Sequence, residues 1–385
     1  RMALFDKWMK NMVEKILDGL SDTERTKLLP MVNNFSWLTF QEIAERAKTG
    51  IPLSQPEGST RKNFMDFRDL VFIPAQLATF PLLQDVPVDT SITIGPMAKK
   101  PLHLPIPLLI TGMGYGVSVS KAARLALCKA SALTNTAANS GEAGFVPWEK
   151  ELCHKYIVQY NRARWGNRPE DLKKADAIEV RIGQGASASD GFTIPADQMD
   201  AELREHLNIN PDQDAEMPNR FPDIDTIEDL KAEVENLKKI TDGVPVGVKI
   251  GAGDIEKDID AAIYCGFDFI TLDGGEGGTA GSLEITINNF CIPLVMGISK
   301  AAKYLEQKGM KDKISVIAAG GAHTPGDFLK AMALGADAVY IGQPLLIAMV
   351  YQQAHKMPVG TNPVEMFVYG GKETEKLDWE EAAQS

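Results

Sequence analysis

The sequence predicts a closed (β/α)8 TIM barrel preceded by an α-helical N-terminal extension. Three observations carry this prediction. From about residue 105, short apolar runs alternate with amphipathic segments, as in a parallel sheet whose outer face is covered by helices. Most of these runs end in glycine or polar residues, which is typical of the active end of a barrel. The first hundred residues instead carry Leu, Met, Ile and Trp at helical spacing.

Eight apolar runs have the length and composition of buried strands. They cover residues 107–113, 135–141, 155–161, 177–185, 244–251, 267–275, 314–321 and 338–343. Helical segments are predicted near residues 118–132, 169–175, 226–240, 255–265, 296–308, 324–334 and 345–355. Eight such units favour a closed barrel over an open sheet. Residues 186–225 form a long acidic insert with prolines, and loops of this kind usually lie over a functional site or are mobile.

Three regions follow from these patterns. The extension comprises residues 1–100, the barrel residues 101–360 and a C-terminal tail residues 361–385. Helices are expected over residues 3–28 and 36–48 of the extension. Because nothing in the extension resembles a site, we expect it to pack on the barrel without contributing chemistry.

Composition excludes several classes of protein. The chain is 44% hydrophobic and 24% charged, which is globular usage and excludes a disordered, collagen-like or coiled-coil chain. Its net charge of −12 argues against general attraction to nucleic acid or anionic lipid. The apolar stretches are too short to cross a bilayer. The opening RMALFDKW is amphipathic rather than signal-like; we expect a cytoplasmic protein, and a membrane or targeting segment would lie beyond the ends of this sequence.

The four cysteines give no sign of a metal site or a disulfide framework. Cys128, Cys153, Cys265 and Cys291 stand far apart, with no CxxC pair. This spacing favours a reducing compartment and argues against zinc or iron–sulfur ligation. Cys128 and Cys265 fall on helix positions and are expected in the core.

Glycine loops follow the last two predicted strands. Gly320 and Gly321 follow the seventh strand, and Gly342 and Gln343 follow the eighth. Loops at these places of a barrel bind phosphate, because helix N-termini and glycine backbone can close around an anion. His323, beside the first loop, would either donate to that phosphate or cap a helix.

The GMGYG stretch, with Gly112, Met113, Gly114 and Tyr115, follows the first strand. Its GxGxG spacing, without an acidic residue about twenty positions later, disfavours a Rossmann dinucleotide site. In a barrel the same glycines would let the backbone approach a flat ligand. A planar, phosphorylated cofactor such as FMN would therefore fit a site that has the GMGYG backbone at one end and the phosphate-binding glycine loops at the other.

Lys249 is the only charge in the apolar strand VPVGVKIG. An inward-facing lysine there must meet an anion or a polarised carbonyl. The N1/C2=O edge of a flavin, which gains negative charge on reduction, is a suitable partner. A structural salt bridge to a barrel carboxylate is the alternative.

Further polar residues stand around the predicted strand ends. Glu142 in NSGEAGF and Glu276 in DGGEGGTAG are the acids best placed for proton transfer, although a loop acid is more often only solvated. The further donors are Arg181 and Gln184 on the fourth strand, and Gln159 and Arg164 around the third.

In order along the chain, these motifs resemble the FMN-binding synthase domain of glutamate synthases. The resemblance covers most of residues 90–360. It rests on GMGYGVSVSKAARLAL, NSGEAG, Gln159 with Arg164-Trp165-Gly166, VRIGQGA, GVKI and GEGGT. It implies a barrel that binds FMN, whose reduced N5 delivers hydride to a 2-imino acid formed from a 2-oxo acid and an amine.

The resemblance also implies site residues. The expected catalytic residues are Lys249, Glu142, Glu276 and Arg164. The expected cofactor-binding residues are Gly112, Met113, Gly114, Tyr115, Gln184, Lys249, Asp273, Gly274, Gly275, Gly320, Gly321, Gly342 and Gln343.

Three departures from the family pattern change the expected function. The family's cluster motif ending in CPVG corresponds here to AHKMPVG at residues 354–360, so no iron–sulfur cluster is expected. This sequence has no amidotransferase domain with its N-terminal cysteine, so glutamine hydrolysis would occur elsewhere or not at all. Ser187 to Asp190 replace the lysine of the family's AKPGEGG loop, which argues against 2-oxoglutarate as the substrate.

We therefore predict a stand-alone FMN oxidoreductase of glutamate synthase type. Its partners would be a small 2-oxo acid, ammonia or an amine, and a separate electron-donor protein, with an amidotransferase subunit where glutamine supplies the ammonia. A homo- or hetero-oligomer is expected, without nucleic acid. Two alternatives stay open: an N-methylglutamate synthase-type subunit that uses an alkylamine, and a non-catalytic barrel that binds flavin or another phosphorylated ligand.

Overall fold

The structure is a computed structural model of the chain, and it describes residues 43, 45–50, 54–55, 65–279, 281–358 and 360–385. The chain divides into two units, residues 1–53 and residues 54–385. The helix predicted over residues 3–28 lies outside the described residues. Of the helix predicted over residues 36–48, the described residues 43 and 45–48 are helical.

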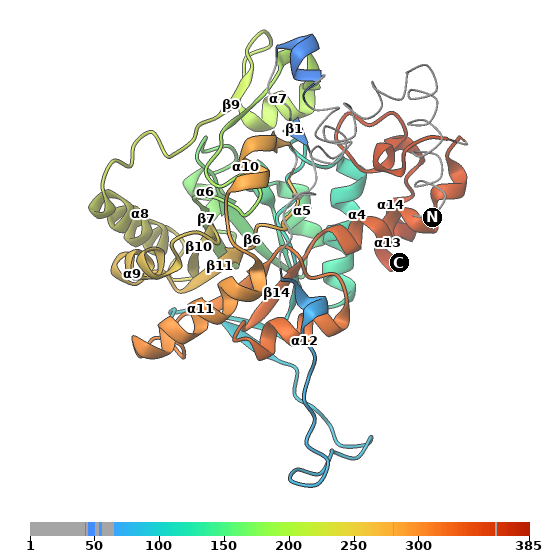
Figure 1. Cartoon of the computed structure of the whole chain (residues 1–385). Helices are drawn as coiled ribbons and strands as arrows, with labels where there is room; N and C mark the ends of the chain where they lie inside the picture. The colour runs from blue at the N-terminus through green and yellow to red at the C-terminus, as the bar shows by residue number, and fades with distance from the viewer. Residues whose placement is uncertain (1–42, 44, 51–53, 56–64, 280, 359) are drawn as a thin grey trace, which may run out of the picture. The chain divides into compact units, whose positions relative to one another are not determined.

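Residues 54–385 contain a closed barrel of eight parallel strands (Figure 1). The strands are β4 (Leu108–Ile110), β5 (Ala137–Asn139), β6 (Lys155–Tyr160), β7 (Ala177–Arg181), β10 (Val246–Gly251), β11 (Phe269–Asp273), β13 (Ser315–Ala319) and β14 (Ala338–Ile341). Each lies within one of the eight predicted runs, and β14 pairs with β4 to close the barrel. The predicted (β/α)8 barrel is confirmed. Continuous apolar sequence forms these strands because helices bury the outer face of the sheet.

Helices cover the outside of the barrel at the predicted places. They are α4 (Lys121–Leu133), α6 (Pro169–Leu172), α8 (Ile227–Ile240), α9 (Ile255–Cys265), α11 (Leu294–Gln307), α12 (Pro325–Ala333) and α13 (Gln343–Tyr351). The short helices that periodicity did not predict include α5 (Pro147–Leu152) and α10 (Glu284–Asn289). No helix among the described residues is long and apolar enough to cross a membrane.

An antiparallel hairpin closes the amino-terminal end of the barrel. It consists of β2 (Ile92–Ile94) and β3 (Leu102–Leu104), and its buried residues pack against Leu109, Ile157 and Phe269 inside the barrel. The α-helical extension predicted over residues 1–100 is therefore wrong for residues 65–100. These residues contain the 3₁₀ helix η1 (Phe67–Asp69) and β2, but no α-helix, because four prolines interrupt any helical period.

The insert predicted as a loop over residues 186–225 has structure of its own. Strands β8 (Phe192–Ile194) and β9 (Ala215–Met217) pair antiparallel around α7 (Ala201–Leu207). Its buried residues, including Leu203 and Met217, pack with Tyr115 and Trp165. Because Tyr115 and Trp165 follow β4 and β6, the insert covers part of the carboxyl end of the barrel.

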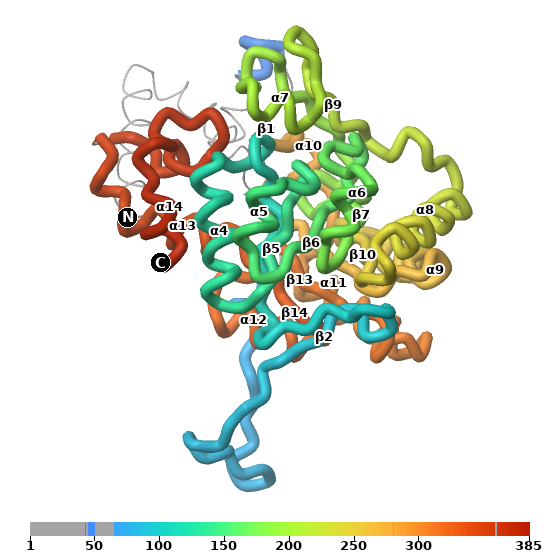
Figure 2. The backbone as a smooth tube through the Cα atoms, turned by 180° about the vertical axis from the view of Figure 1, so that it is seen from behind, coloured from blue at the N-terminus to red at the C-terminus, as the bar shows by residue number. Residues whose placement is uncertain are grey.

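The C-terminal residues 361–385, predicted as a tail, pack on the barrel. Helix α14 (Trp379–Gln384) lies beside α4 (Figure 2). Met366 and Leu377 are buried with Leu127 of α4 and Met349 of α13. This segment is therefore part of the core of the barrel unit.

Candidate active site

Polar side chains gather inside the barrel toward the carboxyl ends of the strands. Gln159 lies on β6, Glu179 and Arg181 on β7, Lys249 on β10 and Thr271 on β11. All are buried. The parallel register places Gln159 opposite Glu179, and Lys249 between Arg181 and Thr271. Four neighbouring strands thus place five polar side chains close together. Burying them in a barrel core would cost free energy unless they form hydrogen bonds and ion pairs with one another.

The carboxylate of Glu179 is the centre of this cluster. It accepts hydrogen bonds from Asn139 Nδ2 (2.8 Å), Gln159 Nε2 (3.0 Å) and Thr271 Oγ1 (2.7 Å). The Asn139 amide also donates to the hydroxyl of Tyr340 on β14 (2.9 Å). Burial, followed by the charge of Glu179, raises the pKa of Tyr340 well above its ordinary value. Three donors satisfy a fully buried carboxylate and offset the cost of burying it inside the barrel.

Lys249 forms an ion pair at the carboxyl end of the same strands. Its Nζ atom lies 3.1 Å from Asp273 Oδ2, and both side chains are buried. Burial opposes the charge of Lys249, but the carboxylates of Asp273 and Glu179 outweigh it and raise the pKa of the lysine above its ordinary value. Lys249 is therefore a buried cation at neutral pH. Asp273 Oδ1 has no hydrogen-bond partner among the described residues.

Arg181 is the second buried cation of the cluster. One of its terminal nitrogens, Nη2, lies 3.0 Å from Glu142 Oε1. Its Nε and Nη1 atoms are buried and have no hydrogen-bond partner among the described residues. Burial, with the nearby charge of Arg181, lowers the pKa of Arg162 to about 10. Two arginines thus stand close together with open donor positions, an arrangement suited to an anion.

The glycine loops predicted to hold phosphate are neighbours, because β13 and β14 pair directly. Gly320 and Gly321 have φ angles of +81° and +75°, a region that residues with side chains rarely adopt. A Cβ atom on Gly320 would come within 2.7 Å of Asp273 Oδ1, so this loop lies against the lysine–aspartate pair. Gly342 and Gln343 begin α13 beside it, without a side-chain cap.

The starts of the two helices differ. The backbone N–H groups of His323 and Thr324 donate to the carboxylate of Asp327 (3.1 and 3.0 Å), so the first turn of α12 is already capped. A cavity of about 400 Å³ runs along α13 and is lined by His323, Pro344, Ile347, Ala348, Tyr351, Gln352 and Ser385. Of the two helix starts, that of α13 is the one without a side-chain cap.

Glu276 lies beside the first of these loops. A Cβ atom on Gly321 would come within 3.3 Å of Glu276 Cβ, and the carboxylate accepts a hydrogen bond from the Leu294 N–H (3.0 Å). Burial raises the pKa of Glu276 from 4.5 to about 7, against the opposing effect of that hydrogen bond. Burial therefore favours the protonated form of Glu276 near neutral pH.

The GMGYG stretch lies partly at the cluster. Cβ atoms on Gly112 and Gly114 would come within 2.8 Å of Asn139 Oδ1 and 3.1 Å of the Glu142 nitrogen. The Met113 side chain instead packs in the apolar core beside α4. The Tyr115 ring meets the ring of Trp148 edge-on at 5.5 Å. This stretch therefore approaches the cluster through its glycine backbone rather than through Met113 and Tyr115.

Gln184, Gly274 and Gly275 complete the predicted cofactor residues. Gln184 is buried after β7, and its backbone oxygen lies beside the end of β10, where a Cβ on Gly251 would come within 3.0 Å of it. Gly274 follows Asp273 directly, and the Gly275 N–H donates to the Ile292 carbonyl (3.0 Å). The structure brings all three to the carboxyl end of the barrel.

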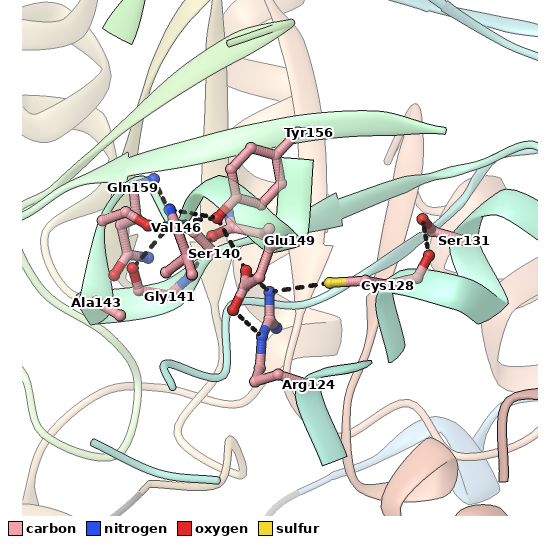
Figure 3. A network of polar contacts seen from close by, with 12 residues as sticks. Arg124, Cys128, Ser131, Ser140, Gly141, Ala143, Val146, Glu149, Tyr156 and Gln159 are labelled. Atoms are coloured by element: carbon pink, nitrogen blue, oxygen red, sulfur yellow. Dashed lines mark hydrogen bonds and ion pairs between the residues drawn. The ribbon is translucent and has the colours of Figure 1, made fainter. Parts of the chain in front are cut away.

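A buried polar network fixes the loop that carries Glu142 (Figure 3). Arg124 of α4 and Glu149 of α5 form a fully buried ion pair. The Tyr156 hydroxyl donates to Glu149 (2.8 Å) and accepts from the Val146 N–H (3.2 Å). This network ties residues 141–146 to the helices behind the barrel, so the position of Glu142 depends on groups outside the cluster.

Arg164 lies apart from the cluster. Its guanidinium pairs with Asp223 (2.8 Å) and Glu233 (3.2 Å) and stacks on the rings of Tyr160 and Phe221. It stands four residues beyond β6 in a turn with a φ angle of +62°, which directs the side chain toward α8. The structure therefore gives Arg164 a place in anchoring the end of the insert, and it does not bring this predicted catalytic residue to the other three.

Two functional candidates were missed from the sequence. Glu179 is the single acid in the strand AIEVR, a signal related to the one that identified Lys249, although Arg181 is a second charge in this strand. Arg162 donates to the backbone oxygens of Ser189 (2.7 Å), Asp190 (2.8 Å) and Asn219 (2.7 Å) and so holds the insert over Arg181. Only Asn161 separates it from the end of β6, and its place beyond a strand end could have pointed to it.

These residues fit a planar, phosphorylated cofactor. Lys249 supplies a buried cation, Gln159 Oε1 and Asp273 Oδ1 are buried without partners among the described residues, and the loops at Gly321 and Gly342 offer backbone to a phosphate. No group of three His, Cys, Asp or Glu residues within the described ranges is arranged to hold a metal ion. The expected absence of an iron–sulfur cluster stays a prediction.

The raised pKa of Glu276 predicts a dependence of stability on pH. The folded protein keeps this proton up to about pH 7, whereas the unfolded chain loses it near pH 4.5. The contribution of Glu276 to the free energy of unfolding is therefore fully present below pH 4.5 and is lost as the pH rises through 7. Glu276→Gln should gain on the order of 2 kcal/mol relative to wild type between about pH 5 and 8.

Urea unfolding of both proteins across this pH range measures the difference. Glu235→Gln, which changes an exposed glutamate of α8, is the matched control and should give a difference that does not vary with pH. A Glu276→Gln difference that is equally flat would show that the carboxyl group is charged throughout.

The comparisons with known proteins agree on the family. Residues 59–367 match the model of the conserved region in glutamate synthase. A glutamate synthase large subunit-like protein of Rhizobium meliloti is 35% identical over 324 residues, 83% of this chain and 73% of that protein. An archaeal-type glutamate synthase [NADPH] of Thermotoga sp. is 32% identical over 330 residues, 80% of this chain. The chain spans 65% of the length of that relative.

Solved structures agree on the fold alone. An L230A mutant of flavocytochrome b2 with benzoylformate aligns with a TM-score of 0.51 at 19% identity, covering 93% of this chain and 83% of that one. Similarity at this level of identity concerns the barrel rather than the chemistry. By the family model and the sequence relatives, the chain belongs to the glutamate synthase family.

Proposed function

We propose that this chain is an FMN-dependent oxidoreductase that reduces a 2-imino acid formed from a 2-oxo acid and ammonia or an amine. The observation that carries the proposal is the pair of buried cations, Lys249 and Arg181, at the carboxyl ends of adjoining strands. One cation would serve the cofactor and the other the carboxylate of the substrate. Membership of the family and a fold shared with flavin enzymes support this reading.

FMN, when bound, would supply hydride chemistry at its ring, and the chain would supply charge and position. The backbone at Gly320, Gly321 and Gly342 would hold the phosphate at the two neighbouring loops. Lys249 would lie at the N1/C2=O edge, because a buried cation stabilises negative charge there. Lys249 also forms an ion pair with Asp273, which is the structural salt bridge considered as the alternative role. The two roles are compatible, since the ammonium group has three N–H donors.

Arg181 would bind the substrate carboxylate. Its Nη1 atom has no partner among the described residues, and it would donate a charged hydrogen bond to an oxygen of that carboxylate. Glu142, in contact with the same guanidinium, is then the acid nearest the reacting carbon, and we propose it for proton transfer. Protonated Glu276 beside Gly321 would face the phosphate without charge repulsion.

The separate electron donor, an amidotransferase subunit and a cytoplasmic location also remain proposals. The donor and the amidotransferase subunit are suggested by the family to which the chain belongs. The N-methylglutamate synthase-type alternative differs only in the amine. No contact of the described residues selects between ammonia and an alkylamine, and assays with both amines separate the two.

The purified protein should be yellow and release FMN, not FAD, on denaturation, because one phosphate cradle is present. Gly321→Asp should abolish flavin retention, since it places a carboxylate in the cradle, whereas aspartate is among the residues that tolerate the required φ angle. Gly278→Asp is the matched control, because a side chain there meets nothing within 4 Å. Chromatography of the released flavin and visible absorbance measure both. A colourless wild type that takes up no FMN would refute the proposal.

Lys249→Met should lower the midpoint potential of bound FMN. Loss of a cation a few ångströms from the flavin edge corresponds to about 1–4 kcal/mol, or on the order of 20–90 mV for a two-electron couple. Dye-coupled reduction measures the potential, and Lys300→Met, on the exposed face of α11, is the control. An unchanged potential with normal FMN binding would leave Lys249 only its structural ion pair with Asp273.

Arg181→Lys should raise KM for the oxo acid more than it lowers kcat, because lysine does not reproduce the fixed donor geometry of the guanidinium. Loss of a charged hydrogen bond costs about 1.5–3 kcal/mol, which corresponds to roughly 10- to 150-fold. Steady-state kinetics with an artificial reductant test this, and Arg168→Lys, an exposed arginine before α6, is the control. A change confined to kcat would move Arg181 from substrate binding to another role.

A further inference from the structure

An extended segment projects from the end of the barrel that the hairpin closes (Figures 1 and 2). We call residues 71–88 the arm. Before the arm, Phe67 of η1 is buried and its carbonyl accepts from Lys330 Nζ of α12 (2.7 Å). After the arm, β2 enters the hairpin. Both ends of the arm are therefore fixed to the barrel, while the residues between them stand away from it.

The arm exposes apolar side chains far beyond what a monomer usually tolerates. Of the 23 large hydrophobic residues that are exposed in the described part of the chain, nine belong to the arm: Val71, Phe72, Ile73, Leu77, Phe80, Leu82, Leu83, Val86 and Val88. Ile73 is 94% exposed and Leu77 88%. Together they present on the order of 1,000 Å² of apolar surface, whereas the largest patch on a typical monomer is about 300–600 Å². Such a surface indicates an interaction site.

The arm is poorly suited to a membrane. Within the described chain, the only backbone hydrogen bond made by its residues runs from the Val86 N–H to the Leu83 carbonyl (3.2 Å). Irregular backbone with unpaired polar groups does not enter the hydrocarbon of a bilayer. Residues 71–98 also contain no lysine or arginine, so an anionic headgroup finds no counter-charge. Protein is the more suitable partner, because it can pair the free N–H and C=O groups.

We propose that the arm is a dimerisation element that packs against the same arm of a second copy of this chain. An isologous pair about a two-fold axis covers both arms with one contact and lets their extended backbones pair antiparallel. The apolar area that each copy brings matches the roughly 800 Å² per partner of a stable interface. Two copies of a chain of net charge −12 repel each other, and this repulsion is weakest where neither copy is charged. Residues 71–84 carry no ionisable group, so contact between the arms is favoured.

The dimer would leave the candidate active site open. The arm joins the barrel next to the hairpin that covers the amino-terminal ends of the strands, whereas the polar cluster lies at their carboxyl ends. Arm pairing is therefore independent of the proposed function, and a failure of either proposal leaves the other untouched.

Sedimentation velocity of the full chain between roughly 0.1 and 50 µM should show a dimer. The triple variant Ile73→Asp, Leu77→Asp, Phe80→Asp should sediment as a monomer over the same range, because three carboxylates would meet across the two-fold axis. These side chains are exposed, so the variant should keep the circular dichroism spectrum of the wild type. Leu133→Asp, another exposed leucine, at the end of α4, is the control and should remain dimeric.

Hydrogen exchange separates the other possible coverings of the arm. Protection of the amides of residues 71–88 should rise with protein concentration. Protection that is independent of concentration would mean that the arm is covered within one chain. Co-flotation of the wild type, but not of the triple variant, with phosphatidylcholine vesicles would assign the arm to lipid. Each of these two results would overturn the proposal. A wild type that is monomeric, or a triple variant that stays dimeric, would overturn it as well.

Discussion

The interior of the barrel depends on one compensated carboxylate. Glu179 accepts from donors on β5, β6 and β11, and its charge helps to keep Lys249 protonated. Without it, two buried cations, Lys249 and Arg181, would stand on adjoining strands with only the carboxylates of Asp273 and Glu142 to balance them. The strands themselves need only apolar residues to form. Glu179 is what allows a polar ligand site with two buried cations inside a core that would otherwise be filled by aliphatic side chains.

The outer layer supports the same site by a different means. The buried Arg124–Glu149 pair and the Tyr156 hydroxyl hold the loop that carries Glu142, and Arg162 holds the insert by its backbone oxygens. Buried arginines are costly unless their donors are used. Here most of them are used on backbone and on a helix carboxylate, so these groups hold the loops around the cluster in place.

Sequence reasoning worked where a single physical pattern decides the structure. Continuous apolar runs located all eight strands, since burial on both faces leaves few other choices. It failed where structure arises from contacts distant along the chain. The three-residue strands of the insert and of the β2–β3 hairpin are too short for periodicity. The same limit applies to the site: Lys249 stood out as a lone charge in a strand, but the direction of Arg164, set by carboxylates about 60 and 70 residues later, could not be derived from its neighbours.

The closure of the barrel has a consequence for the order of folding. Strand β4 pairs with β14, joining residues 108–110 to residues 339–341, and to β5 through the single register pair of Ile110 and Ala138. Strand β4, the first barrel strand to be synthesised, therefore cannot pair along its second edge until β14 has been made. The entropy of closing a loop of more than two hundred residues is lost only at that step. The C-terminal segment that packs on α4 follows immediately. The β4–β14 pairing and the C-terminal segment that covers it on the outside can thus form in close succession. This shortens the time during which an open parallel edge is exposed to other chains.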